Sequence, residues 1–214
     1  MSLTIAFDLD GTLIDSVPQI ADCVNRALAD RGIAPLARNT VQGFVGRGLP
    51  ALVRQVAEAR QLPEAAQDPL HDRILALYTE VDTPPSALYP GVRAALGVLK
   101  DQGHSLAICT NKPYEATLKC LADTGLALDF DRVIGGDSLP TRKPDPAMLH
   151  AALDGAARAL YVGDSETDAE TADAAQVPFL LFTEGYRKSP IEDLPHKATF
   201  SDFTILPQLV NDLS

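Results

Sequence analysis

Two aspartates separated by one residue follow the first apolar run of the chain, and this pattern constrains the fold more than any other. The segment reads Ile5-Ala6-Phe7-Asp8-Leu9-Asp10-Gly11-Thr12. Strand residues at positions i and i+2 share a face, so Asp8 and Asp10 are expected to leave a buried strand on the same side. Two carboxylates that close raise each other's pKa unless a cation or a proton lies between them. The pair therefore predicts a divalent-metal site, an acid/base pair, or a nucleophile beside an acid.

The size and composition of the chain are typical of a soluble globular protein. Its 214 residues, 46% of them hydrophobic, are enough for one large domain or for a domain with a sub-domain. No apolar run approaches the roughly 18 residues that span a bilayer, and no secretory signal is evident. Cys23, Cys109 and Cys120 lack metal-like spacing and are expected to be buried thiols in a reducing compartment. We therefore expect a cytoplasmic protein without a membrane partner.

The charge of the chain is strongly negative and unevenly distributed. The formal net charge is −11, which argues against a nucleic-acid partner because phosphate backbones require basic patches. Residues 16–84 contain 7 arginines and 8 acidic residues, so nearly all of the negative excess lies outside them. An anionic substrate would be repelled there unless a metal ion and local basic residues met it.

The apolar periodicity divides the chain into two parts. Residues 16–84 have helical spacing throughout, whereas the remainder alternates between helices and strands. In the first part, the predicted helices cover residues 18–32, 49–61 and 65–81, with a short one that Thr40 caps and that ends at Val45. In the second part, the predicted strands cover residues 4–9, 105–109, 132–134, 159–162, 179–182 and 198–200. Its predicted helices cover residues 92–102, 113–123, 146–153, 166–175 and 205–213.

This order predicts an α/β fold with a doubly wound, mostly parallel, Rossmann-like sheet. We expect residues 1–15 and 85–214 to form the α/β core, with residues 16–84 inserted as an all-helical unit. The helix over residues 166–175 ends at Gln176, so this residue is expected to adopt a left-handed or strained helix end without the help of a glycine.

Polar residues follow several of the predicted strands, at the sheet edge where ligands of open parallel sheets bind. Besides the first block, the strand over residues 105–109 leads into Thr110-Asn111-Lys112, and the strand over residues 159–162 leads into Gly163-Asp164 and on to Asp168. Between these two lies Arg142-Lys143-Pro144-Asp145-Pro146, which places a lysine just before a helix.

These four blocks, in this order, resemble the four motifs of the haloacid dehalogenase-like hydrolase superfamily. The motifs are an Asp-x-Asp start, a Thr or Ser after the second strand, a Lys, and an acidic Gly-Asp-x-x-x-Asp ending. Within it, the chain looks most like the phosphoglycolate phosphatase group, through Asp-Leu-Asp-Gly-Thr-Leu-Ile-Asp-Ser, Tyr-Pro-Gly-Val and Arg-Lys-Pro-Asp-Pro. The resemblance implies a Mg²⁺-dependent phosphatase acting on a small phosphorylated metabolite, with 2-phosphoglycolate as the first expectation, and a helical cap at residues 16–84.

The resemblance also implies a role for each motif residue. Asp8 would be the nucleophile and Asp10 the acid/base, while Thr110 and the amides around Asn111 would bind the phosphoryl oxygens. Lys143 would offset the charge of that group. The expected ligands of Mg²⁺ are Asp8, the carbonyl of Asp10, Asp164 and Asp168. Further candidates for phosphate or substrate binding are Asn111, Arg47, Gly11 and Thr12.

Several alternatives remain open at the sequence level. A phosphomutase shares all four motifs, and sugar-phosphate phosphatase, pyrophosphatase or nucleotidase action is equally compatible with them. The intact Asp-x-Asp pair argues against the dehalogenase and phosphonatase branches, in which the second acid is replaced. A non-enzymatic phospho-acceptor module gathers similar residues but lacks the helical insert. The sequence leaves both a monomer and a homodimer possible.

Overall fold

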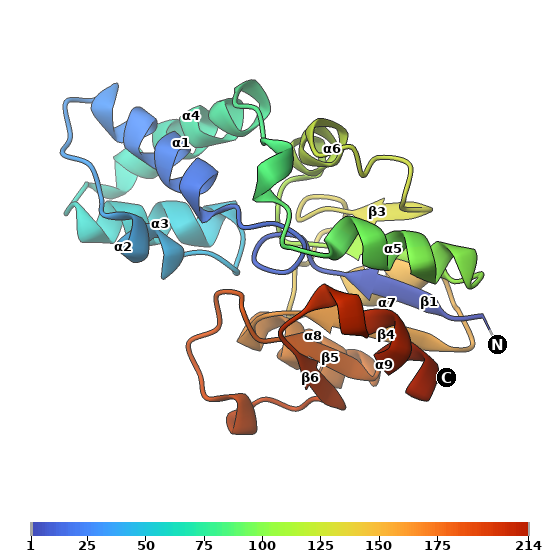
Figure 1. Cartoon of the computed structure of the whole chain (residues 1–214). Coiled ribbons are helices and arrows are strands. Elements are labelled where there is room, and N and C mark those ends of the chain that lie inside the picture. The colour runs from blue at the N-terminus through green and yellow to red at the C-terminus, as the bar shows by residue number, and fades with distance from the viewer. Residues whose placement is uncertain (1, 214) are drawn as a thin grey trace.

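The computed structural model of the protein describes residues 2–213, and its centre is a six-stranded parallel sheet (Figure 1). The spatial order of the strands is β3-β2-β1-β4-β5-β6. Their bounds are β1 Thr4–Phe7, β2 Ser105–Cys109, β3 Arg132–Ile134, β4 Ala159–Gly163, β5 Phe179–Phe182 and β6 Ala198–Phe200. The chain winds outward from β1 in one direction through β3 and then in the other through β6. The switch in direction therefore lies at β1, and its carboxyl end is where a doubly wound sheet binds ligands.

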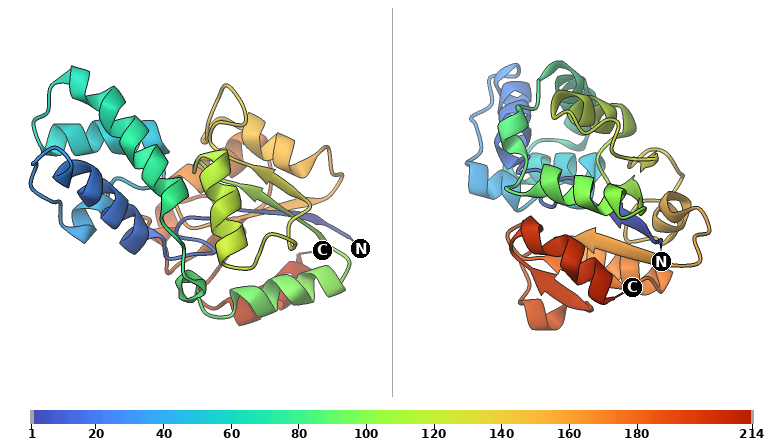
Figure 2. Two further views of the ribbon diagram at one scale, coloured as in Figure 1. Left: turned by 90° about the horizontal axis from the view of Figure 1, so that it is seen from above. Right: turned by 45° about the vertical axis from the view of Figure 1, so that its right-hand side comes forward.

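Strand alternation explains why both faces of the sheet are covered. Ile5 and Phe7 of β1 belong to one apolar cluster and Ala6 to another, because successive side chains point to opposite faces. On the first face lie α5 Val92–Asp101, α6 Tyr114–Asp123 and α9 Leu206–Asp212. On the second face lie α7 Ala147–Leu153 and α8 Glu166–Ala175. The two layers are visible on either side of the sheet in Figure 2.

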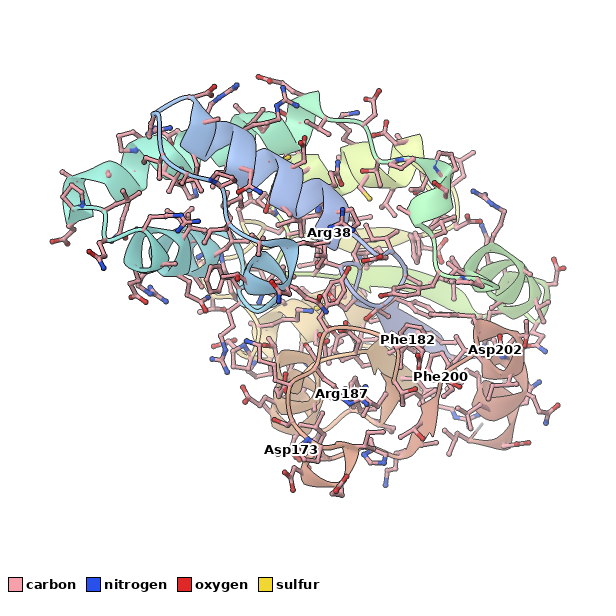
Figure 3. The ribbon with its side chains drawn as sticks, turned by 60° about the vertical axis from the view of Figure 1, so that its left-hand side comes forward. Arg38, Asp173, Phe182, Arg187, Phe200 and Asp202 are labelled. Carbon is pink, nitrogen blue, oxygen red and sulfur yellow. The ribbon has the colours of Figure 1, made fainter. Side chains whose placement is uncertain are left out.

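Aromatic side chains close the first face near the β6 edge. Phe182 of β5 and Phe200 of β6 lie side by side in Figure 3, with ring centroids 5.3 Å apart. Phe203 completes the group at 4.9 Å from Phe182 and 5.2 Å from Phe200. This packing joins the last strands to α9 and gives the far edge of the sheet its own apolar contacts.

Residues between β1 and α5 form helices that pack on one another beyond the carboxyl end of β1 (Figure 1). The helices are α1 Val17–Ala29, α2 Arg38–Gln42, α3 Leu49–Ala59 and α4 Gln67–Glu80. Their inward-facing residues, among them Val24, Leu52 and Ile74, form an apolar cluster distinct from those of the sheet. We call the segment from α1 to α4, residues 17–80, the helical insert. Short 3-10 turns occur at Glu64–Ala66, Pro85–Ala87, Ile191–Asp193 and Phe203–Ile205.

Most of the predicted elements are confirmed, and the doubly wound parallel sheet with them. The strands β2, β3, β5 and β6 and the helix α8 have the predicted bounds. Gln176 has φ 55° and ψ 38°, which is the left-handed helix end that the sequence predicts. The three cysteines are buried and unbridged, as expected. Within residues 2–213, no helix combines the length and apolar character needed to cross a membrane.

Some local predictions are wrong. The helices predicted to end at residues 32 and 45 end at Ala29 and Gln42. The strand β1 ends at Phe7 instead of Leu9, because the Leu9 carbonyl accepts N–H groups from the turn that follows, including that of Leu13. Thr40 does not cap α2, which begins at Arg38 after the extended residue Ala37. The N–H of Thr40 donates to the carbonyl of Ala37, so Thr40 already lies inside the first turn.

Candidate active site

The end of β1 places Asp8 at the edge of the sheet, and a tight turn follows it. The N–H of Asp8 donates to the Val162 carbonyl (2.9 Å), which continues the parallel ladder for one more residue. Gly11 then has φ +92°, and a Cβ there would lie 2.6 Å from Asp164 Oδ2. Only glycine fits this position, because both the left-handed backbone and the close carboxylate exclude a side chain. Asp8 and Asp10 line the same two cavities.

Lys143 is buried among three oxygen acceptors. Its Nζ lies 2.8 Å from Asp8 Oδ1, 2.7 Å from Asp168 Oδ1 and 2.8 Å from the hydroxyl of Tyr161. The three ammonium hydrogens are thereby used. Burial lowers the pKa of Lys143, but the charges of Asp168 and Asp8 outweigh that effect and raise it. Lys143 is accordingly a fixed positive charge beside the nucleophile candidate.

Asp8 is the carboxylate of this group with a free oxygen. Its Oδ1 accepts from Lys143, whereas Oδ2 has no hydrogen-bond partner among residues 2–213. Burial raises the pKa of Asp8 to about 7, and Lys143 opposes that rise. A positive charge added next to Asp8 would lower its pKa and favour the ionised, nucleophilic form.

Asp164 is enclosed by the turn after β1 and by a loop after β5. Thr12 Oγ1 donates to Asp164 Oδ1 (2.8 Å), and the N–H of Tyr186 donates to Oδ2 (2.6 Å). Gly185 is required on that side, because a Cβ would lie 2.3 Å from the Asp164 side chain. Burial, followed by the charges of Asp168 and Asp8, raises the pKa of Asp164 strongly.

Oxygen atoms of Asp8, Asp164 and Asp168 lie within 4.8 Å of one another, and all three residues are buried. Among residues 2–213, Lys143 is the cation that contacts this group, so two negative charges remain uncompensated when all three carboxylates ionise. Buried carboxylates in such excess raise each other's pKa, as seen at Asp164, unless a cation joins them. Oxygen donors suit a hard divalent cation such as Mg²⁺. The donor set therefore fits a metal ion.

Asp168 already has protein partners on both oxygens. Oδ1 accepts from Lys143 and from the Tyr161 hydroxyl, and Oδ2 accepts from Ser165 Oγ at 2.6 Å. Ser165 and Asp168 form a capping box at the start of α8. Burial raises the pKa of Asp168, but Lys143 and these hydrogen bonds outweigh burial and lower it. Asp168 is thus firmly ionised and holds the lysine in place.

The segment after β2 supplies Thr110 and Asn111. Thr110 Oγ1 accepts the N–H of Lys112 (3.2 Å) and keeps its own hydrogen for a ligand. The Asn111 side chain instead contacts main chain on both sides. Its Nδ2 donates to the carbonyls of Gly46 and Lys143, and its Oδ1 accepts the N–H of Lys143. Asn111 therefore joins Lys143 to the helical insert, and it also lines the small cavity described below.

Asp10 is paired with a different lysine from Asp8. Lys112 Nζ lies 3.1 Å from Asp10 Oδ1 and 3.4 Å from Oδ2. The same ammonium lies 5.1 Å from the ring centroid of Tyr78, which comes from α4 of the helical insert. Burial lowers the pKa of Lys112, but the charge of Asp10 outweighs it and raises it. Each of the paired carboxylates thus has its own cation.

Two cavities meet at Asp8 and Asp10, between the sheet and the helical insert. The smaller, of about 40 Å³, is lined by both aspartates, Thr110, Lys112 and apolar residues of the insert such as Leu52. The larger, of about 400 Å³, opens toward Asp164. Its basic lining residues are Arg47, Arg54 and Lys188.

Thr12, Gly11 and Arg47, the remaining site residues predicted from the sequence, all lie near the buried carboxylates or line the larger cavity. Thr12 is fully buried behind Asp164, and the N–H of Gly11 donates to the Ile14 carbonyl. Arg47 lines the larger cavity and lies 3.5 Å from Glu170 of α8, with 59% of its side chain exposed. These positions indicate that Gly11 and Thr12 shape the Asp164 pocket, while Arg47 bridges the insert and the core.

Comparisons with known proteins agree with this geometry. A family model described as haloacid dehalogenase-like hydrolase matches residues 5–182. The chain belongs to the haloacid dehalogenase-like hydrolase family. The resemblance seen in the sequence is thereby confirmed. Within the family, the chain is 49% identical to a phosphoglycolate phosphatase of Rhodobacter capsulatus, over 98% of this chain and 97% of that protein.

Two further matches also cover nearly the full length of both chains. A phosphoglycolate phosphatase of Cereibacter sphaeroides is 46% identical over 98% of both chains. A solved structure of a predicted phosphoglycolate phosphatase from Haemophilus somnus has a TM-score of 0.88 and 30% identity, and the match covers 98% of both chains. These matches therefore extend over nearly the whole chain.

Three residues near the centre were missed by the sequence analysis as site residues. Lys112 holds Asp10, Tyr161 holds Lys143 and Asp168, and Tyr186 contacts Asp164. Lys112 directly follows Thr110-Asn111, and a lysine beside a phosphate-binding motif was the available signal. Tyr161 reads as an ordinary buried strand residue, and Tyr186 lies in a loop outside the motifs, so their contacts required the tertiary structure.

Proposed function

We propose that this protein is a Mg²⁺-dependent phosphomonoester hydrolase that acts through an aspartyl-phosphate, with 2-phosphoglycolate as its substrate. The observation that carries the proposal is the small cavity beside Asp8 and Asp10. Its volume is about 40 Å³, against about 400 Å³ for the larger cavity. Such a space suits a leaving group of a few heavy atoms, such as glycolate, and disfavours a sugar ring or a nucleoside.

In the proposed first step, Asp8 Oδ2 attacks phosphorus and forms an acyl phosphate, while the bond from phosphorus to the leaving oxygen breaks. Lys143 offsets charge on Asp8 and on the phosphoryl oxygens from a fixed position. Thr110 Oγ1 donates its free hydrogen to one of these oxygens. Asp8, Asp164 and the carbonyl of Asp10 would hold Mg²⁺, and this ion would supply further positive charge for the phosphoryl group.

Asp10 serves both halves of the proposed reaction. Its carboxyl group lines the small cavity, where the leaving oxygen is expected, and it donates a proton to that oxygen as the bond breaks. Once the leaving alcohol has gone, the ionised Asp10 removes a proton from the water that attacks the acyl phosphate. Asp10 is then protonated again, phosphate leaves, and Asp8 is free for the next turnover.

The names of the relatives support this substrate. The two proteins that are 46% and 49% identical over nearly the full chain are named phosphoglycolate phosphatases. The helical insert is proposed to act as a cap, since Leu52 and Tyr78 from two of its helices line the small cavity and exclude water from it.

A substrate panel tests the proposal. We expect kcat/KM for 2-phosphoglycolate to exceed that for glucose 6-phosphate, a nucleoside monophosphate and pyrophosphate by at least about tenfold, a difference of about 1.4 kcal/mol in transition-state binding. Chelation of divalent cations should abolish turnover of every substrate, and Mg²⁺ should restore it. Equal rates across the panel, or conversion of a sugar phosphate to its isomer, would contradict the assignment.

A further inference from the structure

The small cavity contains a cation that the proposed chemistry does not use. Among the described residues that line it, Lys112 is the only lysine or arginine. Its side chain is 3% exposed, so this charge belongs to the cavity and not to the solvent surface. The other lining residues are the two aspartates, uncharged polar groups and apolar side chains of the helical insert.

Lys112 has hydrogen-bonding capacity to spare. Within residues 2–213, the acceptors of its ammonium are the two oxygens of Asp10, at 3.1 and 3.4 Å. An ammonium group carries three hydrogens, and the Tyr78 ring at 5.1 Å accepts none of them as a conventional hydrogen bond. At least one N–H therefore remains for a ligand in the cavity. Lys143 differs, because three oxygen acceptors surround it.

The position of Lys112 matches the place where a substrate's second anionic group would lie. Asp10 is proposed to protonate the leaving oxygen, so the atoms attached to that oxygen lie beside Asp10. In a phosphorylated 2-hydroxy acid, the carboxylate is only one carbon further from the leaving oxygen. Without a cation there, this carboxylate would face the charges of Asp8 and Asp10 at short range in a poorly solvated space.

The cations of the larger cavity are less suited to this task. Arg47 is already paired with Glu170, and more than half of its side chain is exposed. Lys188 Nζ donates to the Gly43 carbonyl at 2.5 Å. Arg54 and these two residues line the larger cavity, and none of them lines the smaller one. Solvent screens exposed charges of this kind more strongly than a buried ammonium.

We propose that the ammonium group of Lys112 binds the carboxylate of the leaving group and thereby selects phosphorylated 2-hydroxy acids over neutral alkyl phosphates. The inference rests on the proposed function and deepens it, because it names the residue that recognises the substrate. Lys112 then contacts Asp10 and the substrate carboxylate together, which aligns the leaving oxygen with the proton donor.

The test compares two substrates of equal length in wild type and Lys112 variants. 2-Phosphoglycolate carries the carboxylate, and 2-hydroxyethyl phosphate replaces it with a neutral CH₂OH group. We expect the ratio of their kcat/KM values to fall at least tenfold in Lys112→Met, chiefly through a higher KM for 2-phosphoglycolate. Lys112→Arg, which keeps the charge, should retain a ratio closer to wild type. Lys100→Met is the matched control, since Lys100 lies on α5 and contacts Leu128 and Asp129.

The outcomes separate this inference from the proposed function. If both substrates lose the same factor in Lys112→Met, Lys112 acts only through Asp10 and the inference is wrong, while the phosphatase assignment stands. If the wild-type protein does not prefer 2-phosphoglycolate to 2-hydroxyethyl phosphate, the proposed substrate itself is wrong, and the inference fails with it. Thermal unfolding of each variant checks the fold. Should Lys112→Met unfold, Lys112→Gln provides the neutral variant and must show the same selective loss.

Discussion

The chemistry of the site depends on which aspartate keeps a free oxygen. One oxygen of Asp8 contacts Lys143 and the other has no partner in the described part of the chain, whereas both oxygens of Asp168 are engaged. Replacement of Asp8 by Asn removes the nucleophile but preserves the side-chain shape. We expect turnover of an aryl phosphate to fall at least about a thousandfold, with circular dichroism unchanged. Activity retained in Asp8→Asn would exclude an aspartyl-phosphate at this residue.

Tyr161 is the residue through which the core of the sheet positions Lys143. Its hydroxyl lies 2.8 Å from Lys143 Nζ and 2.7 Å from Asp168 Oδ1. Tyr161→Phe leaves both groups one partner short in a buried place, and we expect the free energy of unfolding to fall by about 1–3 kcal/mol. Denaturant unfolding measures this change. Tyr114→Phe serves as the comparison, since Tyr114 is not among the residues that line the two cavities. A similar loss there would contradict the assignment.

At the scale of elements, the end of α8 shows how a local backbone requirement is met by an unfavourable residue. Gln176 occupies the left-handed region with φ 55°, which is costly for a residue with a Cβ. Gln176→Gly should raise the free energy of unfolding by about 0.5–1 kcal/mol. This corresponds to a melting temperature about 1–4 °C higher.

The matched control for that prediction lies one residue earlier. Ala175 is in the last turn of the same helix, where glycine has no conformational advantage. Ala175→Gly should lower the stability by about 1 kcal/mol. Two changes of the same sign would show that the left-handed backbone at residue 176 does not determine the outcome.

The residue just before β2 is a histidine that links stability to pH. His104 is buried, its Nδ1 accepts the N–H of Leu3 (3.1 Å), and its Nε2 has no partner among the residues that the structure describes. Burial lowers the pKa of His104, so its contribution to stability is complete above the unfolded pKa of about 6.5 and is lost as pH falls below it. His104→Gln keeps an acceptor for Leu3 without titrating.

Denaturant unfolding at pH 7 and pH 5 measures this effect. The loss of stability between the two pH values should be smaller in His104→Gln than in wild type, because the variant no longer gains a proton on unfolding. Equal losses in the two proteins would show that folding leaves the pKa of His104 unchanged, and the prediction would be wrong.

At the scale of the whole molecule, three buried carboxylates from distant parts of the chain lie together. We therefore expect a metal ion bound between them to stabilise the fold. Mg²⁺ at about 100 times its dissociation constant should add about 2.7 kcal/mol to the free energy of unfolding. The melting temperature should then rise by roughly 5–10 °C. Differential scanning calorimetry with and without Mg²⁺ measures the shift independently of activity.

The specificity of that shift is tested by one substitution. Asp164→Asn removes a charge from the group of Asp8, Asp164 and Asp168, and it should abolish most of the Mg²⁺-dependent rise. An undiminished rise in this variant would place the stabilising ion elsewhere in the protein.

The sequence by itself determined the order of the elements, the parallel sheet and the four motifs at strand ends. Each of these depends on information carried locally: apolar periodicity marks helices and strands, and the residues just after a strand lie at its carboxyl end. The left-handed conformation of Gln176 was equally local, because the residue follows the last turn of a predicted helix.

Only the tertiary structure decided which charges meet. Asp8 and Lys143 are 135 positions apart, and Asp10 and Lys112 are 102 apart. Their pairing therefore depends on how β1, β2 and the loop that contains Lys143 pack together. The same holds for Tyr161, which the sequence presents as an apolar strand residue, and for the small cavity that the helical insert closes over Asp10. Side-chain contacts between distant segments follow from packing geometry, which no local pattern of residues encodes.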